Sequence, residues 1–250
     1  MSSHFPKTIH YIWFGNGEHS EIQKRCMTSW RKFAQGFEII RWDESNCDIY
    51  ENLYVSQAYT SKKWAFVSDY FRFKILSKHG GVYMDTDMEL HKPITNIASN
   101  GTFFAFERQD VVHAGIIGAT PNHPIIIELM NSYHSDAFIY KNGNFNLVAI
   151  PMRTTKILRR HGLQLNGMQQ NLVFNTVVFP ANILTLDTGD GKLIAEHHYE
   201  ASWSDKKRAK SYKLYLQEEY FKNGAIANFR RKLKRTVSRA KFFIIAKSPL

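Results

Sequence analysis

Cysteine and long apolar runs are both scarce in this sequence. The two cysteines, Cys26 and Cys47, are too few for a disulfide scaffold and lack metal-ligand spacing, so we expect two ordinary small buried residues. No stretch approaches the roughly 20 apolar residues that a membrane-spanning helix needs. Residues 1–7 lack the basic stretch and apolar run of a secretory signal. We therefore expect a cytoplasmic protein, either soluble or peripheral on a membrane.

Glycine and proline are also too few to dominate the chain. With 14 Gly, 7 Pro and 44% hydrophobic residues, the composition excludes collagen-like, low-complexity and wholly disordered chains. No internal repeat is apparent. A length of 250 residues is enough for one sizeable domain with its own core, and too short for two large ones.

The formal net charge of +11 is distributed unevenly along the chain. Residues 1–205 hold 19 Lys and Arg against 20 Asp and Glu, a balance of −1. Residues 206–250 hold 14 Lys and Arg against 2 Glu, a balance of +12. The sequence therefore predicts a neutral domain over residues 1–205, followed by a basic C-terminal segment over residues 206–250.

The basic segment also has helical periodicity. Apolar residues recur at steps of three and four between residues 229 and 244, and seven cations lie within residues 230–241. Such an amphipathic helix suits an anionic lipid surface, so we expect residues 226–250 to bind a membrane. The alternative is a helix that docks its apolar stripe on the core. We expect no nucleic-acid partner, because aromatic residues do not alternate with the basic ones in an RNA-binding motif.

Strand and helix patterns alternate along the neutral domain. The predicted helices are residues 21–33, 63–78 and 124–132. The predicted strands are residues 8–14, 37–42, 82–86, 102–106 and 111–119. This alternation predicts an α/β layer fold with a largely parallel central sheet.

The segment GGVYMDTDMEL, residues 80–90, carries the strongest chemical signal. An apolar strand runs into Asp85-Thr86-Asp87, and an extended chain would point both carboxylates to the same side. Ligands of open α/β sheets bind at the carboxyl ends of strands. Converging carboxylates repel each other unless a cation lies between them, and Mg²⁺ or Mn²⁺ prefers such hard oxygen ligands. The alternative is a pair of solvated carboxylates.

Two further sets of residues can join this site. Asp69 and Arg72 are three apart in a predicted helix and share a face, where they suit a sugar hydroxyl and a phosphate, or pair only with each other. His197 and His198 are adjacent, so at most one of them faces a given site. A neutral imidazole there could complete the coordination of Mn²⁺.

Four segments of the chain carry a family resemblance when taken together. They are FPKTIHYIWFG, CMTSW, WAFVSDYFRFKILSKHGGVYMDTDMELHKPI and AEHHYEASW, at residues 5–15, 26–30, 64–94 and 195–203. In this order they resemble the DXD-containing glycosyltransferases of family 32, a group with many capsule and surface-polysaccharide transferases and distant similarity to clostridial glucosylating toxins. The resemblance implies a Rossmann-like GT-A fold, a nucleotide-sugar donor, Mn²⁺ dependence with Mg²⁺ as the alternative, and retention of the anomeric configuration.

The resemblance also implies roles for individual residues. Asp85 and Asp87 form the DXD motif, and His197 completes the metal ligands. Asp69 and Arg72 grip the donor sugar and steady the departing phosphate. The remaining donor-binding residues implied are Trp13, near the nucleobase, together with Tyr83, Ser202 and Trp203.

The sequence departs from the family pattern in its second half. Ile150-Pro151 stands where many members have Gly-Pro, in a segment that shapes the acceptor side, and Tyr199 replaces a tryptophan. Retention is consistent with front-face attack, whereas double displacement needs a nucleophile, for which Glu107 and Asp110 are the residues to test. Competing hypotheses are a Mg²⁺ phosphohydrolase and a non-catalytic membrane or RNA adaptor that uses only the C-terminal segment.

The partners follow from the same resemblance. We expect a UDP-linked hexose, UDP-galactose first, transferred to a saccharide acceptor on a lipid carrier. The protein would then lie peripherally on the cytoplasmic face of a membrane. A protein acceptor is the alternative.

Overall fold

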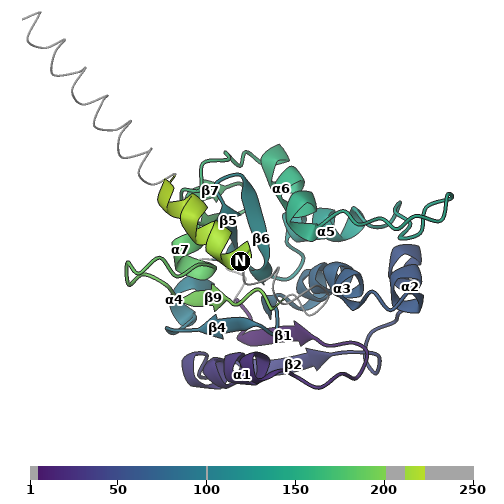
Figure 1. Cartoon of the computed structure of the whole chain (residues 1–250), viewed down its shortest axis with the longest axis horizontal. Coiled ribbons are helices and arrows are strands. Elements are labelled where there is room, and N and C mark those ends of the chain that lie inside the picture. Colours follow the sequence, from purple (N-terminus) through teal and green to yellow (C-terminus); the bar gives the residue numbers. More distant parts are fainter. Residues whose placement is uncertain (1–4, 100, 201–211, 223–250) are drawn as a thin grey trace, which may run out of the picture.

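The computed structural model describes residues 5–99, 101–200 and 212–222 (Figure 1). Its strands are β1 (Thr8–Ile12), β2 (Glu38–Trp42), β3 (Gly81–Met84), β4 (Met88–Leu90), β5 (Thr102–Arg108), β6 (Val111–Ala119), β7 (Gln170–Leu172), β8 (Thr176–Phe179) and β9 (Ala195–His197). Its helices are α1 (Glu21–Phe33), α2 (Leu53–Thr60), α3 (Trp64–His79), α4 (Thr95–Ala98), α5 (Pro124–Asn131), α6 (Ile150–Arg160) and α7 (Ala181–Leu184), followed by a helical segment at residues 212–222.

The central sheet has the strand order β2-β1-β3-β6-β5-β8-β7. Strands β2, β1, β3, β5 and β8 run in one direction, whereas β6 and β7 run against them. This mostly parallel sheet confirms the predicted α/β fold class. The sequence did not predict that antiparallel β6 would separate β3 from β5. Strands β4 and β9 form a small second sheet.

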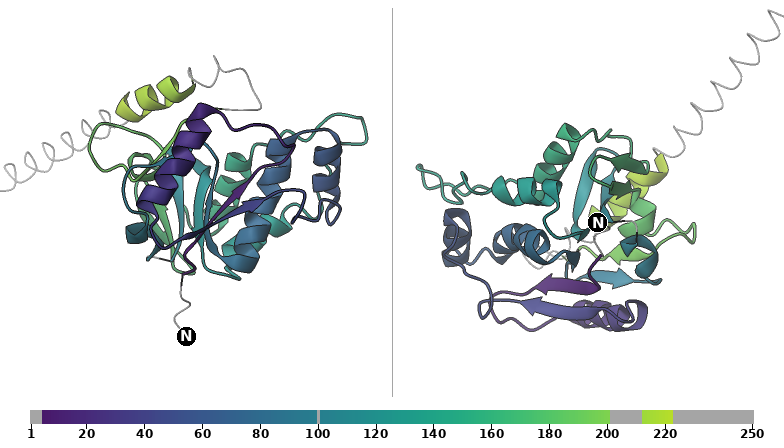
Figure 2. Two further views of the ribbon diagram at one scale, coloured as in Figure 1. Left: turned by 90° about the horizontal axis from the view of Figure 1, so that it is seen from below. Right: turned by 180° about the vertical axis from the view of Figure 1, so that it is seen from behind.

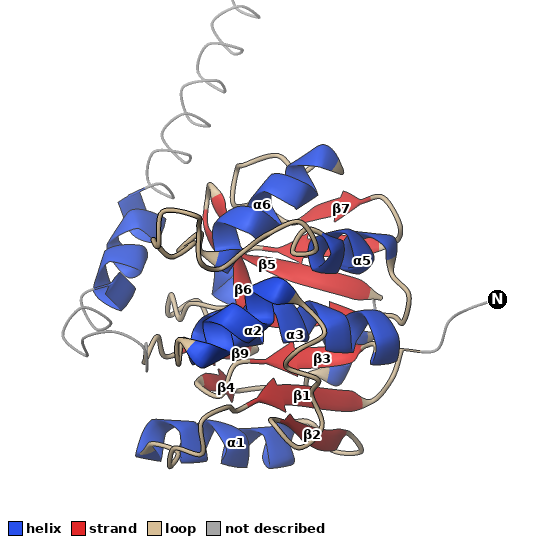
Figure 3. Cartoon of the chain, turned by 90° about the vertical axis from the view of Figure 1, so that its right-hand side faces the viewer, coloured by secondary structure: helices blue, strands red, loops and turns tan. Residues whose placement is uncertain are grey.

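Helices cover both faces of the central sheet. Figure 3 shows α2, α3, α5 and α6 on the near side of the strands, and Figure 2 shows α1 on the opposite side from α3. The alternation of side chains along each strand supplies two apolar cores. In β5, for example, Phe104 and Phe106 pack on the side of α3, whereas Phe103 and Ala105 pack on the side of α4 and α7.

Two local features bring α1 and α3 to the sheet. Helix α1 begins with a capping box in which the Ser20 hydroxyl accepts a hydrogen bond from the Gln23 backbone, as its residue types favour. Helix α3 ends at Gly80, and Gly80 and Gly81 have φ values of 64° and 86°. A Cβ at Gly81 would lie 2.7 Å from the Thr8 carbonyl oxygen, so this tight entry into β3 needs glycine.

The last described helix packs on the body of the protein. In residues 212–222, Leu216 is buried beside Ala181, Leu186 and Tyr199. Residues 226–250, for which membrane binding is predicted, lie outside the described residues. Within the described part, no helix is both long and apolar enough to cross a bilayer.

Candidate active site

The DXD residues lie in a turn at the carboxyl end of β3. The Asp85 backbone N–H donates to the carbonyl of Gly115 in β6 at 2.7 Å, and Met88 N–H donates back to the Asp85 carbonyl at 3.0 Å. The expected extended conformation of residues 85–87 was therefore wrong, because this backbone turn connects β3 directly to β4. The two carboxylates nevertheless converge, since both have an oxygen within 4.8 Å of a nitrogen of His197.

Helix α3 contributes a buried ion pair to the same place. Arg72 Nη2 lies 2.9 Å from Asp69 Oδ1, and Nη1 donates to the Ala114 carbonyl at 2.7 Å while lying 3.5 Å from Asp85 Oδ1. The guanidinium also stacks over the Tyr83 ring at 4.6 Å, and the Tyr83 hydroxyl donates to Asp85 Oδ1 at 2.6 Å. The structure thus brings together four of the predicted donor-site residues.

Burial gives this pair unusual electrostatics. Burial raises the pKa of Asp69 from 3.8 to about 7, although the charge of Arg72 opposes the shift. For Arg72, burial disfavours the charge, but Tyr83 and the carboxylates of Asp85 and Asp69 outweigh it and raise the pKa above its ordinary value. The guanidinium therefore stays charged while Asp69 titrates near neutrality.

Asp87 and His197 form the other half of the site. His197 Nε2 lies 3.1 Å from Asp87 Oδ1. Burial alone would raise the pKa of Asp87, but the His197 charge and hydrogen bond lower it to about 2. Burial likewise opposes the charge on His197, and Asp87 outweighs it and raises the pKa of the imidazole. His197 therefore stabilises the ionised form of Asp87 in the metal-free protein.

The residues present fit a divalent metal ion. Two carboxylates and an imidazole are a donor set that suits Mn²⁺ or another transition metal. Space beside these donors is kept free by Gly115, where a Cβ would lie 2.7 Å from Asp85 Oδ2. Asp85, Asp87 and His197 are therefore the candidate metal ligands.

His113 is a site residue that the sequence reasoning missed. Its Nε2 lies 2.9 Å from His197 Nδ1, and its Nδ1 accepts from the Gly115 backbone N–H at 3.2 Å. Burial, followed by the charge of His197, lowers the pKa of His113 well below its ordinary value, so the ring is neutral. This contact orients the His197 ring through the nitrogen that faces away from Asp87. The available signal was a lone histidine in the apolar run VVHAGIIGA of β6.

Glu200 connects the DXD turn to the start of α1. Its backbone N–H donates to Asp87 Oδ2 at 2.9 Å, and its carboxylate accepts from the Ser20 hydroxyl at 2.5 Å. Trp13 lies in the loop before Ser20, and its indole ring contacts Gly17 and His19. The predicted partners Ser202 and Trp203 lie outside the described residues.

The two proposed nucleophiles differ sharply in environment. Glu107 is buried, and its carboxylate accepts from the Tyr212 hydroxyl at 3.1 Å. Burial raises the pKa of Glu107, against an opposing effect of His197. The Asp110 side chain is 61% exposed and pairs with Arg108 at 3.1 Å. Of the two, Glu107 lies in the electrostatic environment of the candidate site.

The adjacent histidines serve different places, as predicted. His197 faces Asp87, whereas His198 Nε2 lies 2.7 Å from Glu89 Oε2. Their separation follows from the alternation of side chains at the end of β9.

Sequence comparison finds that part of the chain is similar to known glycosyltransferases. Residues 20–104 match the family model described as glycosyltransferase sugar-binding region containing DXD motif. An uncharacterized glycosyltransferase of Acanthamoeba polyphaga mimivirus is 32% identical over 134 residues, which cover 48% of this chain and 52% of that protein. The alpha-1,4-N-acetylglucosaminyltransferase of Homo sapiens is 31% identical over 99 residues, covering 38% and 28%. The chain thus spans about half or less of these relatives.

Solved structures give a weaker likeness. The PaToxG glycosyltransferase aligns with a TM-score of 0.48 and 20% identity, covering 62% of this chain and 68% of that one. The galactosyltransferase LgtC aligns with a TM-score of 0.42 and 12% identity, covering 82% and 94%. Because both scores lie below 0.5, the identification rests on the sequence matches. By these matches, residues 20–104 of this chain are similar to the sugar-binding region of glycosyltransferases that contain a DXD motif.

Proposed function

We propose that this protein is a metal-dependent retaining glycosyltransferase of the GT-A type, which moves a hexose from a nucleotide sugar to a saccharide acceptor. The observation that carries the proposal is the convergence of Asp85, Asp87 and His197 beside the charged Arg72. A Mg²⁺ phosphohydrolase would use the first Asp after its first strand as a nucleophile. Here Asp85 already accepts from Tyr83 and lies beside Arg72, an environment that suits a ligand better than an attacking group.

The chemistry needs stabilisation of a nucleoside diphosphate as the glycosidic bond breaks. Arg72 is held in place by Asp69 and the Ala114 carbonyl, so its charge is oriented before the donor binds. Asp85, Asp87 and His197 would hold the metal ion, with His113 orienting the His197 ring. A bound Mn²⁺ supplies Lewis-acid stabilisation of the developing phosphate charge.

Retention is proposed to follow front-face attack. The leaving phosphate oxygen then accepts the proton of the acceptor hydroxyl, and no enzyme base is needed. Double displacement requires a free carboxylate under the anomeric carbon, and Glu107 instead accepts a hydrogen bond from Tyr212. A Glu107→Gln variant separates the two pathways, because only double displacement loses all transfer with it.

For the donor and the acceptor we propose a class of substrate. A UDP-linked hexose, with UDP-galactose first, and an acceptor on a lipid carrier fit the family resemblance. The human relative is named for N-acetylglucosamine transfer, and a relative in Schizosaccharomyces pombe, 24% identical over 138 residues, is an inositol phosphoceramide mannosyltransferase. The names of these two relatives support a screen of several donor sugars. The name of the Schizosaccharomyces pombe relative also supports a lipid-containing acceptor over a protein acceptor.

We also propose that residues 226–250 bind an anionic membrane at the cytoplasmic face. The support is the charge division between residues 1–205 and 206–250. The helix at residues 212–222, which precedes this segment in the sequence, packs on the body of the protein.

The test is a screen of nucleotide sugars for Mn²⁺-stimulated hydrolysis and transfer. We expect one or a few donors to be turned over, and Asp87→Ala to abolish that turnover because it removes a metal ligand. The matched control is Asp48→Ala, which changes an exposed aspartate. Full activity of a folded Asp87→Ala protein would contradict the metal assignment. Release of inorganic phosphate from phosphoesters, with no sugar released from any donor, would favour the phosphohydrolase.

A further inference from the structure

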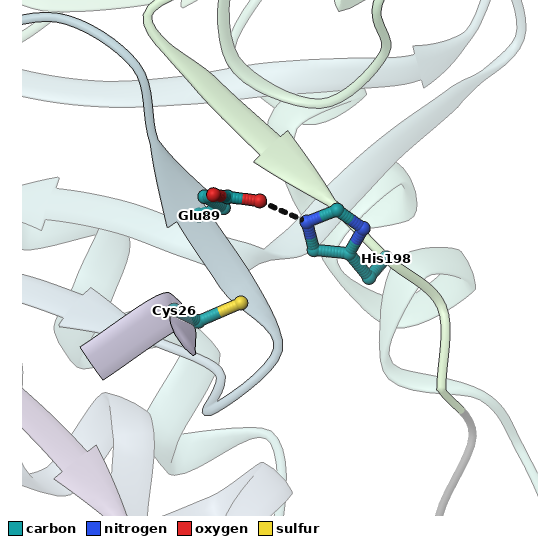
Figure 4. Close-up of side chains that lie close together, drawn as sticks. All are labelled: Cys26, Glu89 and His198. Atoms are coloured by element: carbon teal, nitrogen blue, oxygen red, sulfur yellow. Dashed lines mark hydrogen bonds and ion pairs between the residues drawn. The ribbon is translucent and has the colours of Figure 1, made fainter. Parts of the chain in front are cut away.

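A second group of potential metal ligands lies beside the candidate active site. Cys26 in α1, Glu89 in β4 and His198 after β9 each offer one ligand atom, and these atoms lie within 4.8 Å of one another. Figure 4 shows the three side chains directed toward one space from three separate segments. The carboxylate and imidazole are already in contact, at 2.7 Å.

We propose that Cys26, Glu89 and His198 form a binding site for Zn²⁺, separate from the site of Asp85, Asp87 and His197. A thiolate, an imidazole and a carboxylate are a zinc ligand set, whereas the candidate catalytic site contains no sulfur. Three protein ligands leave a fourth tetrahedral position for water.

The geometry needs only small adjustments, including a slight opening of the Glu89–His198 pair, which lies 2.7 Å apart. Zinc bonds of about 2.0–2.3 Å place neighbouring ligand atoms roughly 3.3–3.6 Å apart. The ligand atoms here are at most 4.8 Å apart, so movements of about 1 Å or less in each side chain close the site. Cys26 is fully buried and held in α1, so the movement falls mainly on Glu89 and His198.

Arg25 occupies this place when no zinc is bound. Its Nη2 lies 3.2 Å from Glu89 Oε2 and 3.3 Å from His198 Nε2. A cation therefore already balances the Glu89 carboxylate, which shows that the site favours positive charge. The Arg25 side chain is 55% exposed, so it can turn into solvent when Zn²⁺ replaces it.

Zinc binding must also displace protons. Burial, followed by the carboxylates of Glu89 and Asp87, raises the pKa of the Cys26 thiol to about 12, so the free thiol is protonated. On binding, the thiol proton is released to solvent and Sγ ligates as the thiolate. The neutral His198 ring, whose Nε2–H donates to Glu89 in the metal-free protein, shifts its single proton through solvent to Nδ1 and then ligates through Nε2.

A bound zinc ion would tie α1 to the small sheet of β4 and β9. That sheet carries the candidate catalytic ligands at its edge, because Met88 pairs with His197 and Asp87 accepts a backbone hydrogen bond from His198 at 3.0 Å. The zinc site would therefore fix the position of the DXD turn relative to α1. The structural role does not depend on the proposed activity.

Cobalt substitution tests this site without measuring turnover. Co²⁺ bound by a thiolate gives an intense sulfur-to-metal charge-transfer band in the near ultraviolet, and oxygen and nitrogen ligands give none. We expect the chelator-treated full chain to show this band on Co²⁺ titration. Added Zn²⁺ should remove it, because thiolate sites favour zinc.

The controls use the only other cysteine and the neighbouring metal site. Cys26→Ser should abolish the band, whereas Cys47→Ser and Asp87→Ala should retain it. Glu89→Gln and His198→Ala should each weaken Co²⁺ binding about tenfold or more, since even outer ligand-orienting partners are worth that much. In an Asp87→Ala background, which removes the other candidate metal site, Zn²⁺ should raise the thermal midpoint, whereas in the double variant Asp87→Ala and Cys26→Ser it should not.

The proposal fails if the wild type shows no charge-transfer band at saturating Co²⁺, or if the band survives in a folded Cys26→Ser protein. Loss of the band in Asp87→Ala would also overturn it, because the thiolate would then belong to the catalytic metal. Unchanged affinity in both Glu89→Gln and His198→Ala would refute the ligand set. None of these outcomes depends on glycosyl transfer, so the two proposals can fail separately.

Discussion

The negative charge of ionised Asp69 destabilises the folded protein. The Asp69 carboxylate pairs with Arg72 at 2.9 Å, yet burial outweighs this attraction and raises its pKa from 3.8 to about 7. We therefore predict that Asp69→Asn, which removes a buried ion pair, makes the metal-free protein more stable at pH 8. The same variant should lose turnover, because the amide orients Arg72 less firmly than the carboxylate does.

The magnitude follows from the pKa shift. A rise from 3.8 to about 7 is roughly three units, and each unit is worth about 1.36 kcal/mol. Between pH 4 and 7 the folded state holds a proton that the unfolded state has released, so wild-type stability falls as the pH rises through this window. Asp69→Asn avoids this loss, and its advantage should grow from near zero at pH 4 to about 2–4 kcal/mol at pH 8.

The assay is urea unfolding of the metal-free wild type and Asp69→Asn at pH 4.5 and pH 8. Asp48→Asn is the matched control, because it makes the same chemical change on the surface and should track the wild type at both pH values. An Asp69→Asn protein that is clearly less stable than the wild type at pH 8 would refute the reasoning. The Asp69–Arg72 attraction would then exceed the cost of burial.

Three further predictions address the same site and the C-terminal segment. Asp87→Asn should destabilise the metal-free protein by about 2 kcal/mol at pH 6, because the pKa of Asp87 is lowered to about 2. This difference in stability from the wild type should shrink as the pH falls toward 2. Equal stability of the two proteins at pH 6 would contradict the pairing of Asp87 with His197. His113→Gln should weaken Mn²⁺ binding about 10- to 100-fold in a spin-resonance titration, and unaltered binding would show that His113 does not orient His197. Removal of residues 226–250 should abolish binding to anionic vesicles at low salt and leave donor hydrolysis unchanged. If the wild-type protein does not bind such vesicles, docking of residues 226–250 on the core is favoured instead.

Local patterns predicted much of the fold. Helix α1 spans residues 21–33 and β6 spans residues 111–119, both as expected, because apolar residues at steps of three and four mark the first and a nearly continuous apolar run marks the second. The direction of β6 was not predictable, since strand polarity depends on pairing with β3 and β5. Helix α6, at residues 150–160, was not assigned, although Pro151 lies in its first turn, where proline is favoured.

The candidate site was predictable where its residues lie close in sequence. Asp69 and Arg72 share a helical face, as periodicity predicted. Asp85 and Asp87 lie two residues apart after one strand and converge through a turn, not through the extended chain on which the period of two depended. His113 and His197 are 84 residues apart in the sequence, so no local sequence pattern could predict their contact. The same holds for Cys26, which has no ligand spacing in the sequence and meets Glu89 and His198 only in the folded chain.

The central claim is that Asp85, Asp87 and His197 hold the metal ion that binds the donor diphosphate. Crystals of the protein grown with Mn²⁺ and UDP, measured at the manganese absorption edge, test it most directly. The account predicts an anomalous peak within bonding distance of Asp87 and His197, with the UDP diphosphate on its open side and Arg72 beside it. A peak at another place, or UDP bound away from these residues, would contradict it.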